Sequence, residues 1–247
     1  MKTILRYAAG FLVLGLLWHA GSVLLGEELL PRPVATTALF LERLATAEFW
    51  GHIGISFARL LAGLFVALAT ALPLGLLMGH WRLFDGATSP LLFITYPIPK
   101  IVLLPVFFTL VGLGDASRVL LIALTVGYQM LVILRATAQA LDPSYLQAFL
   151  SMGGTKRQAV RHVYLPSILP SLFTSLKVAS GTAMAVLFLA ESFATTSGLG
   201  YLIMDAWGMG DVEGMFVDIL AMSLLGLFFY LALGILERIF VPWRAAD

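Results

Sequence analysis

The sequence contains no cysteine and carries little charge. Without cysteine, a disulfide framework, a thiolate metal site and a thiol nucleophile are all excluded. Charged residues make up 12% of the 247 residues, about half of the quarter that a soluble domain usually carries. Hydrophobic residues account for 60%, and the mean hydropathy is +0.96. This composition predicts an all-α membrane protein that crosses the bilayer several times.

The sequence also lacks the motifs of common catalytic sites. Residues 153–156, Gly-Gly-Thr-Lys, place a lysine beside glycine, but they lack the spacing and the preceding strand of a phosphate-binding loop. No hydrolase elbow or zinc-protease pair is present, and the histidines are dispersed at His19, His52, His80 and His162. We therefore expect no catalytic residue, no metal site and no cofactor on this chain. The net charge of +1 gives no reason to expect a nucleic-acid partner.

Six apolar segments approach the length of roughly 20 residues that spans a bilayer. The first could be a signal peptide, but its apolar run is long and no clear cleavage site follows. Between the first two segments, residues 27–50 have the periodicity of a short helix at the interface. We expect residues 1–50 to form an N-terminal span with an extracytoplasmic interfacial segment, and residues 51–247 to form the core. The predicted spans are 4–25, 52–79, 90–111, 119–134, 170–191 and 215–236.

The distribution of lysine and arginine predicts the orientation, because cytoplasmic loops of membrane proteins carry an excess of both. If both termini are cytoplasmic, the inner side is far richer in these residues than the outer side. The loop 139–166 is then cytosolic, and the chain is a multi-pass membrane protein with both termini on the cytoplasmic side. The inner set is Lys2, Arg6, Arg82, Arg135, Lys156, Arg157, Arg161, Arg238 and Arg244, and the outer set is Arg32, Arg43 and Arg118.

The loop 139–166 has strong helix-boundary signals. Asp142 before Pro143 favours a helix start, and the helix should run to about Met152. Gly153 suits the left-handed position that ends a helix. Residues 155–158 fit a capping box that starts a second short helix, which we expect Pro166 to stop.

The first of these helices should present an apolar face that is too small to fold alone. That face needs a partner, either another protein or the ends of the chain's own spans. Its members are Tyr145, Leu146, Phe149 and Leu150.

The same loop resembles the EAA loop of ABC-importer permeases. The resemblance is carried by residues 147–149 (Gln-Ala-Phe), Gly153 and residues 163–166 (Val-Tyr-Leu-Pro), which have the family's spacing, although Gln147 replaces the acid and Phe149 replaces an alanine. In that family the loop is a coupling helix that sits in a groove of the cytosolic ATPase. The resemblance implies contact with the ATPase for Tyr145, Leu146, Gln147, Ala148, Phe149, Gly153, Val163, Leu165 and Pro166.

Other segments resemble the nitrate, taurine and aliphatic-sulfonate branch of these permeases. They include residues 52–63, 97–114 and 190–203, so the resemblance covers about residues 50–244. It implies a type I importer (MetI-like) core preceded by one extra span. It also implies a second copy of the chain, two cytosolic ATPases that hold ATP and magnesium, an extracytoplasmic binding protein and membrane lipid as partners.

The resemblance suggests a small anion as substrate, such as a sulfonate, taurine or nitrate. A vitamin or thiamine-precursor-like solute is an alternative within the same class. A secondary transporter driven by an ion gradient is an alternative from another class, and it leaves the loop spacing unexplained.

Prolines mark the third predicted span. Pro97 and Pro99 each remove a helix hydrogen bond, so this span should be kinked or partly unwound, and the freed carbonyls must face protein or water. Lys100 follows at once. Its ammonium could face a cavity that takes an anion, or it could extend to a lipid headgroup.

Two further pairs of residues are candidates for the pathway or its gate. Arg59 and Glu191 are charges inside predicted spans, and they could serve the substrate, a gate or an ion pair that fixes the bundle. Gly198 and Gly200 permit tight backbone at a gate, but a plain loop would use them too. Close helix packing is the expected role of Gly63, Gly75, Gly79, Gly181 and Ala185.

Overall fold

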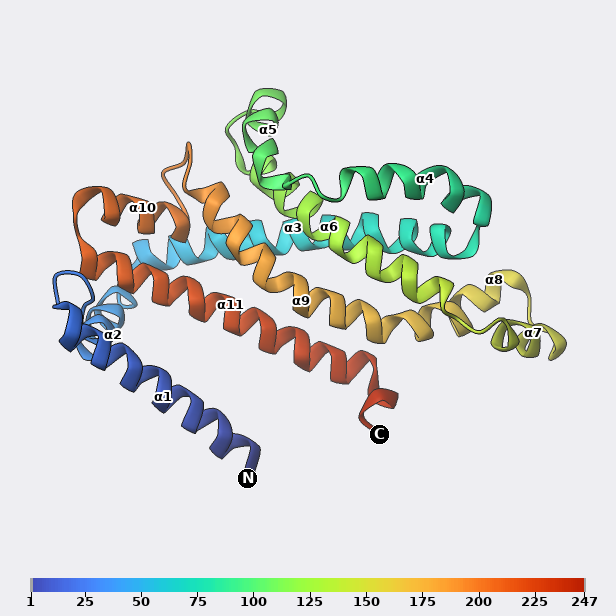
Figure 1. Ribbon diagram of the computed structural model, residues 1–247, viewed down its shortest axis with the longest axis horizontal. Coiled ribbons are helices and arrows are strands. Elements are labelled where there is room, and N and C mark those ends of the chain that lie inside the picture. The colour runs from blue at the N-terminus through green and yellow to red at the C-terminus, as the bar shows by residue number, and fades with distance from the viewer. Residues whose placement is uncertain (1, 247) are drawn as a thin grey trace. The chain divides into compact units, whose positions relative to one another are not determined.

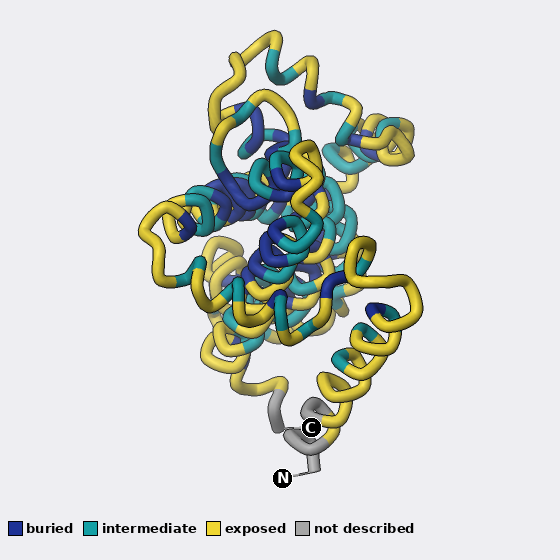
Figure 2. Tube along the Cα trace, turned by 90° about the vertical axis from the view of Figure 1, so that its left-hand side faces the viewer, coloured by how far each residue is buried: buried dark blue, intermediate teal, exposed yellow. Residues whose placement is uncertain are grey.

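The computed structural model describes the backbone of residues 2–246. The side chains of residues 2–5, 7, 8, 245 and 246 lie outside the described part, and with them Lys2 of the orientation argument. Within residues 2–246 the regular secondary structure is entirely helical, with no strand (Figure 1). Figure 2 shows that most turns are exposed, whereas buried residues gather along the helices.

The helices follow one another with short connections. In chain order they are α1 (Lys2–Leu25), α2 (Pro33–Arg43), α3 (Ala47–His80), α4 (Arg82–Thr95), the 3-10 helix η1 (Lys100–Leu103), α5 (Leu104–Val111), α6 (Asp115–Gln139), α7 (Pro143–Ser151), α8 (Lys156–Ala159), the π-helix η2 (Val160–Tyr164), α9 (Leu165–Glu191), α10 (Leu199–Met209), α11 (Val212–Phe240) and the 3-10 helix η3 (Pro242–Ala246).

The six predicted spans all fall on helices of the structure, but not all of these helices are long and apolar enough to cross a membrane. Among the described residues, four helices are long and apolar enough to cross a membrane: α3, α6, the continuous run Lys156–Glu191 and α11. The pair Arg82–Thr95 and Lys100–Val111 passes the same test together but is bent by 88°. Ala9–Leu25 in α1 is a shorter apolar helix. The predicted class, a multi-pass all-α membrane protein, is confirmed.

The chain divides into two compact units. One contains the residues up to Phe57 together with Glu191–Leu225, and it includes α1, α2 and α10. Within it, the indole of Trp18 stacks on Phe216 with ring centroids 6.2 Å apart and donates a hydrogen bond to the carbonyl of Pro31 at 3.0 Å. The short helix predicted between the first two spans is α2.

The second unit contains Ala58–Ala190 and Gly226–Asp247, and α3 packs closely on α6 within it. The close approach depends on glycine. A β-carbon at Gly63 would lie 2.6 Å from Ile122, one at Gly75 would lie 2.8 Å from Leu134, and one at Gly79 would overlap the side chain of Ala138. The expected packing role is confirmed for these three glycines. A β-carbon at Gly181 meets nothing within 4 Å, and Ala185 is exposed, so helix packing within the chain does not explain these two.

The expectation that Pro166 stops the second short helix is wrong. The chain runs from α8 through the π-helical turn Val160–Tyr164 directly into α9. Pro166 is the second residue of α9, and it lies just after this turn. The wider π turn alters the hydrogen-bond pattern at the point where proline lacks an N–H, so the helix accommodates the proline.

Candidate coupling loop and pathway elements

The start of α7 is fixed by Asp142, as its sequence predicts. The Asp142 carboxylate accepts a hydrogen bond from the backbone N–H of Ser144 at 2.8 Å, and Pro143 occupies the first helical position. The Ser144 N–H holds the pKa of the Asp142 carboxyl below its ordinary value. The helix therefore begins at a defined residue.

The end of α7 is equally defined. Gly153 has φ +86°, the left-handed conformation that an L side chain rarely adopts. The Gly153 N–H donates to the Leu150 carbonyl at 3.0 Å, and the Gly154 N–H donates to the Phe149 carbonyl at 3.2 Å. This pair of bonds is the Schellman pattern that ends helices.

The capping box predicted at residues 155–158 is present. The Gln158 N–H donates to the Thr155 hydroxyl at 3.3 Å, and the Thr155 N–H donates to the Gln158 side chain at 2.9 Å. This box starts α8, from which the helix continues into α9. The loop is thus a capped nine-residue helix joined by one tight turn to a long helix.

Part of the apolar face of α7 packs against the rest of the chain, and part of it is exposed. The ring of Phe149 stacks on His162 with centroids 6.1 Å apart, and Leu146 is half-buried. In contrast, Tyr145 is 62% exposed, and no residue of α7 is buried. Gln147 and Ala148 are exposed, whereas Val163, Leu165 and Pro166 are half-buried where the loop rejoins α9.

Side chains from α3, α4, α6 and η2 meet beside this loop. The guanidinium of Arg135 donates to both carboxylate oxygens of Asp85, at 2.5 and 2.7 Å, and Gln139 donates to the same carboxylate at 3.0 Å. Nδ1 of His80 lies 2.9 Å from the hydroxyl of Tyr164. These contacts tie α4 to α6 and α3 to η2. The sequence carries no signal for them, because the partners lie at least 50 residues apart.

The predicted break in the third span is present. Helix α4 ends at Thr95, a 3-10 turn begins at Lys100, and the two parts are bent by 88°. The Lys100 ammonium donates to the carbonyls of Thr95, Tyr96 and Ile98 at 2.6, 2.9 and 2.9 Å. It also lies 4.3 Å from the ring centroid of Tyr128. In this conformation Lys100 therefore satisfies three backbone carbonyls at the break, a role that neither sequence interpretation anticipated.

Two arginines are buried near the turn that precedes α6. Arg59 pairs with Asp115, with Nη2 to carboxylate 2.6 Å and Nε to carboxylate 2.8 Å. Arg118 is buried at 1% exposure and donates to the carbonyls of Leu113, Gly114 and Ala190. The sequence placed Arg118 among the outer loop charges. In the structure its guanidinium instead donates hydrogen bonds to backbone carbonyls of the turn before α6.

Glu191 is the centre of a buried network in the other unit. Its carboxylate oxygens lie 2.9 and 2.8 Å from the Ser56 hydroxyl, and the Gly200 N–H donates to one of them at 3.0 Å. The Ser56 hydroxyl also accepts from the Leu199 N–H at 2.8 Å. Gly198 has φ +108°, and its N–H donates to His52 at 3.1 Å. The segment Gly198–Gly200 is therefore held over the Glu191 carboxylate.

These features define a multi-pass helical membrane protein with one broken span and one capped helical loop. The sequence matches the family described as "Binding-protein-dependent transport system inner membrane component" over residues 71–241. The chain belongs to this family, whose members are the permease subunits of ABC importers.

Relatives within the family have several transport roles. The chain is 30% identical to the formylaminopyrimidine transport permease protein ThiX of Halalkalibacterium halodurans, over 95% of this chain and 94% of that protein. It is 27% identical to the taurine transport system permease protein TauC of Escherichia coli, over 80% and 72% of the two chains. It is 26% identical to the putative aliphatic sulfonates transport permease protein SsuC of Bacillus subtilis, over 87% and 78%.

Solved structures share the fold. The chain resembles the MetNI methionine ABC transporter in an inward-facing conformation with a TM-score of 0.64 and 18% identity, over 76% of this chain and 94% of that one. A second inward-facing crystal form gives a TM-score of 0.62 at 20% identity. The predicted MetI-like core is confirmed at the level of the fold.

Proposed function

We propose that this chain forms the translocation path of an ABC importer and that α7 couples it to a pair of cytosolic ATPases. The observation that carries the coupling is the construction of α7. It is a helix with both ends capped, no buried residue and a Tyr145 side chain that is 62% exposed. An isolated helix of this length is marginal in water, so its exposed side calls for a partner.

The connection from α7 to the membrane supports a mechanical role. One tight turn at Gly153 leads into a continuous helical run of 36 residues, Lys156–Glu191. A displacement of α7 would therefore be transmitted to this long helical run, because no flexible linker separates the two. In the cycle we propose, ATP and magnesium bind only to the ATPases, and their closure moves α7 and opens the path outward.

The assembly we infer contains two copies of this chain, two ATPase subunits and an extracytoplasmic binding protein. In this assembly both termini and α7 lie in the cytosol, which is the orientation that the distribution of lysine and arginine favours. The binding protein delivers substrate from the outer side, and ATP hydrolysis restores the inward-facing state.

Two separate elements are candidates for the pathway or gate. One is the break at Pro97, Pro99 and Lys100, with Arg59 in the same unit, and the other is the segment Gly198–Gly200 over Glu191. Both combine irregular backbone with charge inside predicted spans, a combination that membrane proteins confine to cavities and protein interfaces.

For the substrate we propose a small anion such as a sulfonate, taurine or nitrate. The relatives that transport taurine and aliphatic sulfonates favour this class. The formylaminopyrimidine permease, at 30% identity over 95% of the chain, favours a vitamin precursor as the second candidate. None of these three relatives is named as a transporter driven by an ion gradient.

Uptake by the native membrane tests both candidates. Radiolabelled taurine, nitrate and formylaminopyrimidine would be supplied to cells with and without this chain. The proposal expects ATP-dependent uptake of one of the anions to disappear with the chain. Loss of formylaminopyrimidine uptake alone would assign the vitamin-precursor class, and purification without any ATPase subunit would contradict the ABC assembly itself.

A further inference from the structure

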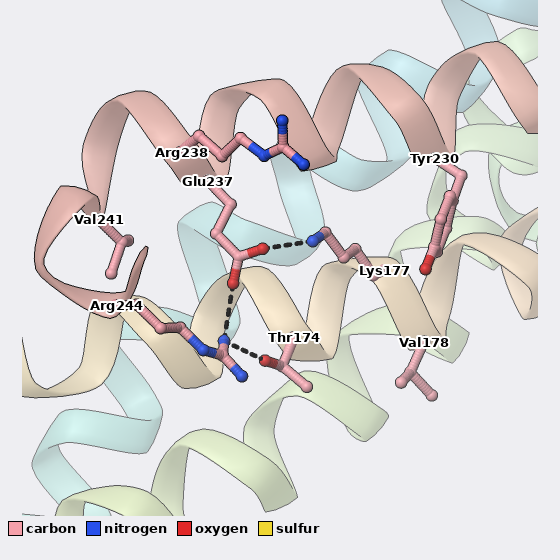
Figure 3. A pocket seen from close by; sticks show the side chains of 8 residues that line it. All are labelled: Thr174, Lys177, Val178, Tyr230, Glu237, Arg238, Val241 and Arg244. Atoms are coloured by element: carbon pink, nitrogen blue, oxygen red, sulfur yellow. Dashed lines mark hydrogen bonds and ion pairs between the residues drawn. The ribbon is translucent and has the colours of Figure 1, made fainter. Parts of the chain in front are cut away.

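An open pocket of about 540 Å³ lies between α9 and α11, and its lining shares no residue with the loop 139–166 or with the pathway candidates (Figure 3). All of its lining residues belong to one compact unit. Four of them are charged: Lys177 on α9, Glu237 and Arg238 on α11, and Arg244 in the C-terminal turn.

The pocket carries more positive charge than its own carboxylate can balance. Three cations and one acid line it, which leaves a surplus of two positive charges, since three minus one is two. The Glu237 carboxylate is shared by Lys177 and by Arg244, whose guanidinium lies 2.7 Å from it. In the part of the chain whose side chains are described, the Arg238 guanidinium takes part in no hydrogen bond or ion pair, and Figure 3 draws none.

The other side of the pocket is apolar and exposed. Val178 is 66% exposed, and Tyr230 is 49% exposed. Both lie on helices long and apolar enough to span a membrane. A tyrosine beside a cluster of cations is typical of the membrane interface, where an apolar ring meets a polar edge.

The surplus charge and the apolar side together indicate an amphipathic ligand. Arg238 and Arg244 belong to the cations whose distribution predicts a cytoplasmic position, and anionic lipids concentrate in that leaflet. Basic pockets between spans on this side suit phosphate headgroups, and a guanidinium binds phosphate through two parallel hydrogen bonds.

We propose that this pocket binds the phosphate group of an anionic phospholipid. The guanidinium groups of Arg238 and Arg244 contact the phosphate, and Val178 and Tyr230 pack against the glycerol and acyl portion. Inorganic phosphate has the same headgroup chemistry but would leave the apolar side uncovered.

Thermal unfolding of the delipidated full chain in detergent tests this assignment. The unfolding temperature would be measured against increasing phosphatidylglycerol, with phosphatidylcholine and inorganic phosphate as parallel titrations. We expect phosphatidylglycerol to stabilise the protein at concentrations where the other two do not. Arg238→Gln should raise the half-maximal lipid concentration about fivefold, since one cation near a membrane surface contributes about 1 kcal/mol of attraction to anionic lipid.

Arg238 makes no contact that folding depends on within the described residues, so its replacement leaves the unliganded protein intact. The matched control is Arg6→Gln, which removes an exposed cation that is predicted on the same membrane side and is not among the residues that line the pocket. Its lipid titration should equal that of the wild type. The proposal is overturned if Arg238→Gln titrates as the wild type does, or if phosphatidylcholine stabilises equally. Equal stabilisation by inorganic phosphate would overturn the lipid assignment in favour of a soluble anion.

Discussion

The carboxylate of Glu191 occupies the space into which a side chain at Gly198 would project. Gly198 has φ +108°, and a β-carbon built there would overlap the carboxylate of Glu191. The same carboxylate accepts the N–H of Gly200. Glycine at position 198 therefore permits both the left-handed turn and the close approach of backbone to a buried acid.

Gly198→Ala should destabilise the protein. The unfavourable backbone conformation costs about 1–3 kcal/mol, and the overlap with Glu191 adds to it. The unfolding temperature of the purified protein would show the loss. The control is Gly208→Ala in α10, where a β-carbon meets nothing within 4 Å. Equal melting of the two variants would mean that the segment is not held on Glu191.

Ser56→Ala should remove the hydroxyl that joins Glu191 to Leu199. Ser56 is fully buried, so the loss leaves the Leu199 N–H without its acceptor and costs about 1–3 kcal/mol. The matched control is Ser223→Ala, an exposed serine whose hydroxyl donates to the carbonyl of Ile219 in its own helix. Thermal unfolding that responds alike to both changes would contradict the network around Glu191.

Lys100→Met should lower the unfolding temperature, because three carbonyls at the break lose a charged donor. Hydrogen bonds to charged groups contribute about 1.5–3 kcal/mol each, so we expect a loss of at least about 2 kcal/mol. Lys156→Met, an exposed lysine in α8, is the control and should melt like the wild type. Unchanged melting of Lys100→Met would show that the break is held by other groups.

The Lys100→Met variant also distinguishes a structural role of Lys100 from a role in the substrate pathway. If Lys100 also contacts an anionic substrate, uptake should fall even at temperatures well below the unfolding transition. A wild-type uptake rate there would leave Lys100 with its structural role alone.

Local signals in the sequence were sufficient to predict the structure of the loop 139–166, except at Pro166. The conformation there is set by residues that contact close neighbours in sequence, so it follows from residue type. These residues are Asp142, Gly153 and the capping box at 155–158. The break at Pro97 and Pro99 was predictable for the same reason. The helix continues through Pro166 because a π turn precedes the proline, and the residue types at 160–164 gave no sign of that turn.

Contacts distant in sequence were not predictable. Asp115 as the partner of Arg59, Ser56 as a donor to Glu191, and the pair Lys177 and Glu237 each join residues more than 50 positions apart. Any charge in a span has many possible partners until packing selects one. The pairing is therefore a property of the fold, and a single sequence holds no signal for it.

Gly153→Val should uncouple ATP hydrolysis from uptake. A β-branched residue is strained at φ +86°, so the turn that joins α7 to the long helix would change its conformation. We expect the substrate transported per ATP hydrolysed to fall severalfold in the reconstituted complex. Gly86→Val in α4 is the control, since that glycine is exposed and its β-carbon would meet nothing within 4 Å. Full coupling in Gly153→Val would contradict the transmission that we propose.

Asp142→Ala should loosen the first turn of α7, while Asp142→Asn should preserve it because asparagine also accepts the Ser144 N–H. Faster amide hydrogen exchange at Ser144 and Tyr145 would report the difference. The bond lowers the pKa of Asp142 from its ordinary 3.8, so the carboxylate cap is fully present above that value. It is lost as the pH falls through the lowered pKa. An exchange rate at Ser144 that is the same in both variants would contradict the cap.

The central claim is that α7 contacts an ATPase, and photo-crosslinking in the native membrane tests it most directly. Benzoylphenylalanine would replace Tyr145, which is 62% exposed on α7, or Tyr230, which is 49% exposed on α11. The account predicts that the probe at position 145 forms an adduct with an ATP-hydrolysing subunit and that the probe at position 230 does not. Adducts of position 145 with this chain alone, or ATPase adducts of equal yield from both positions, would contradict it.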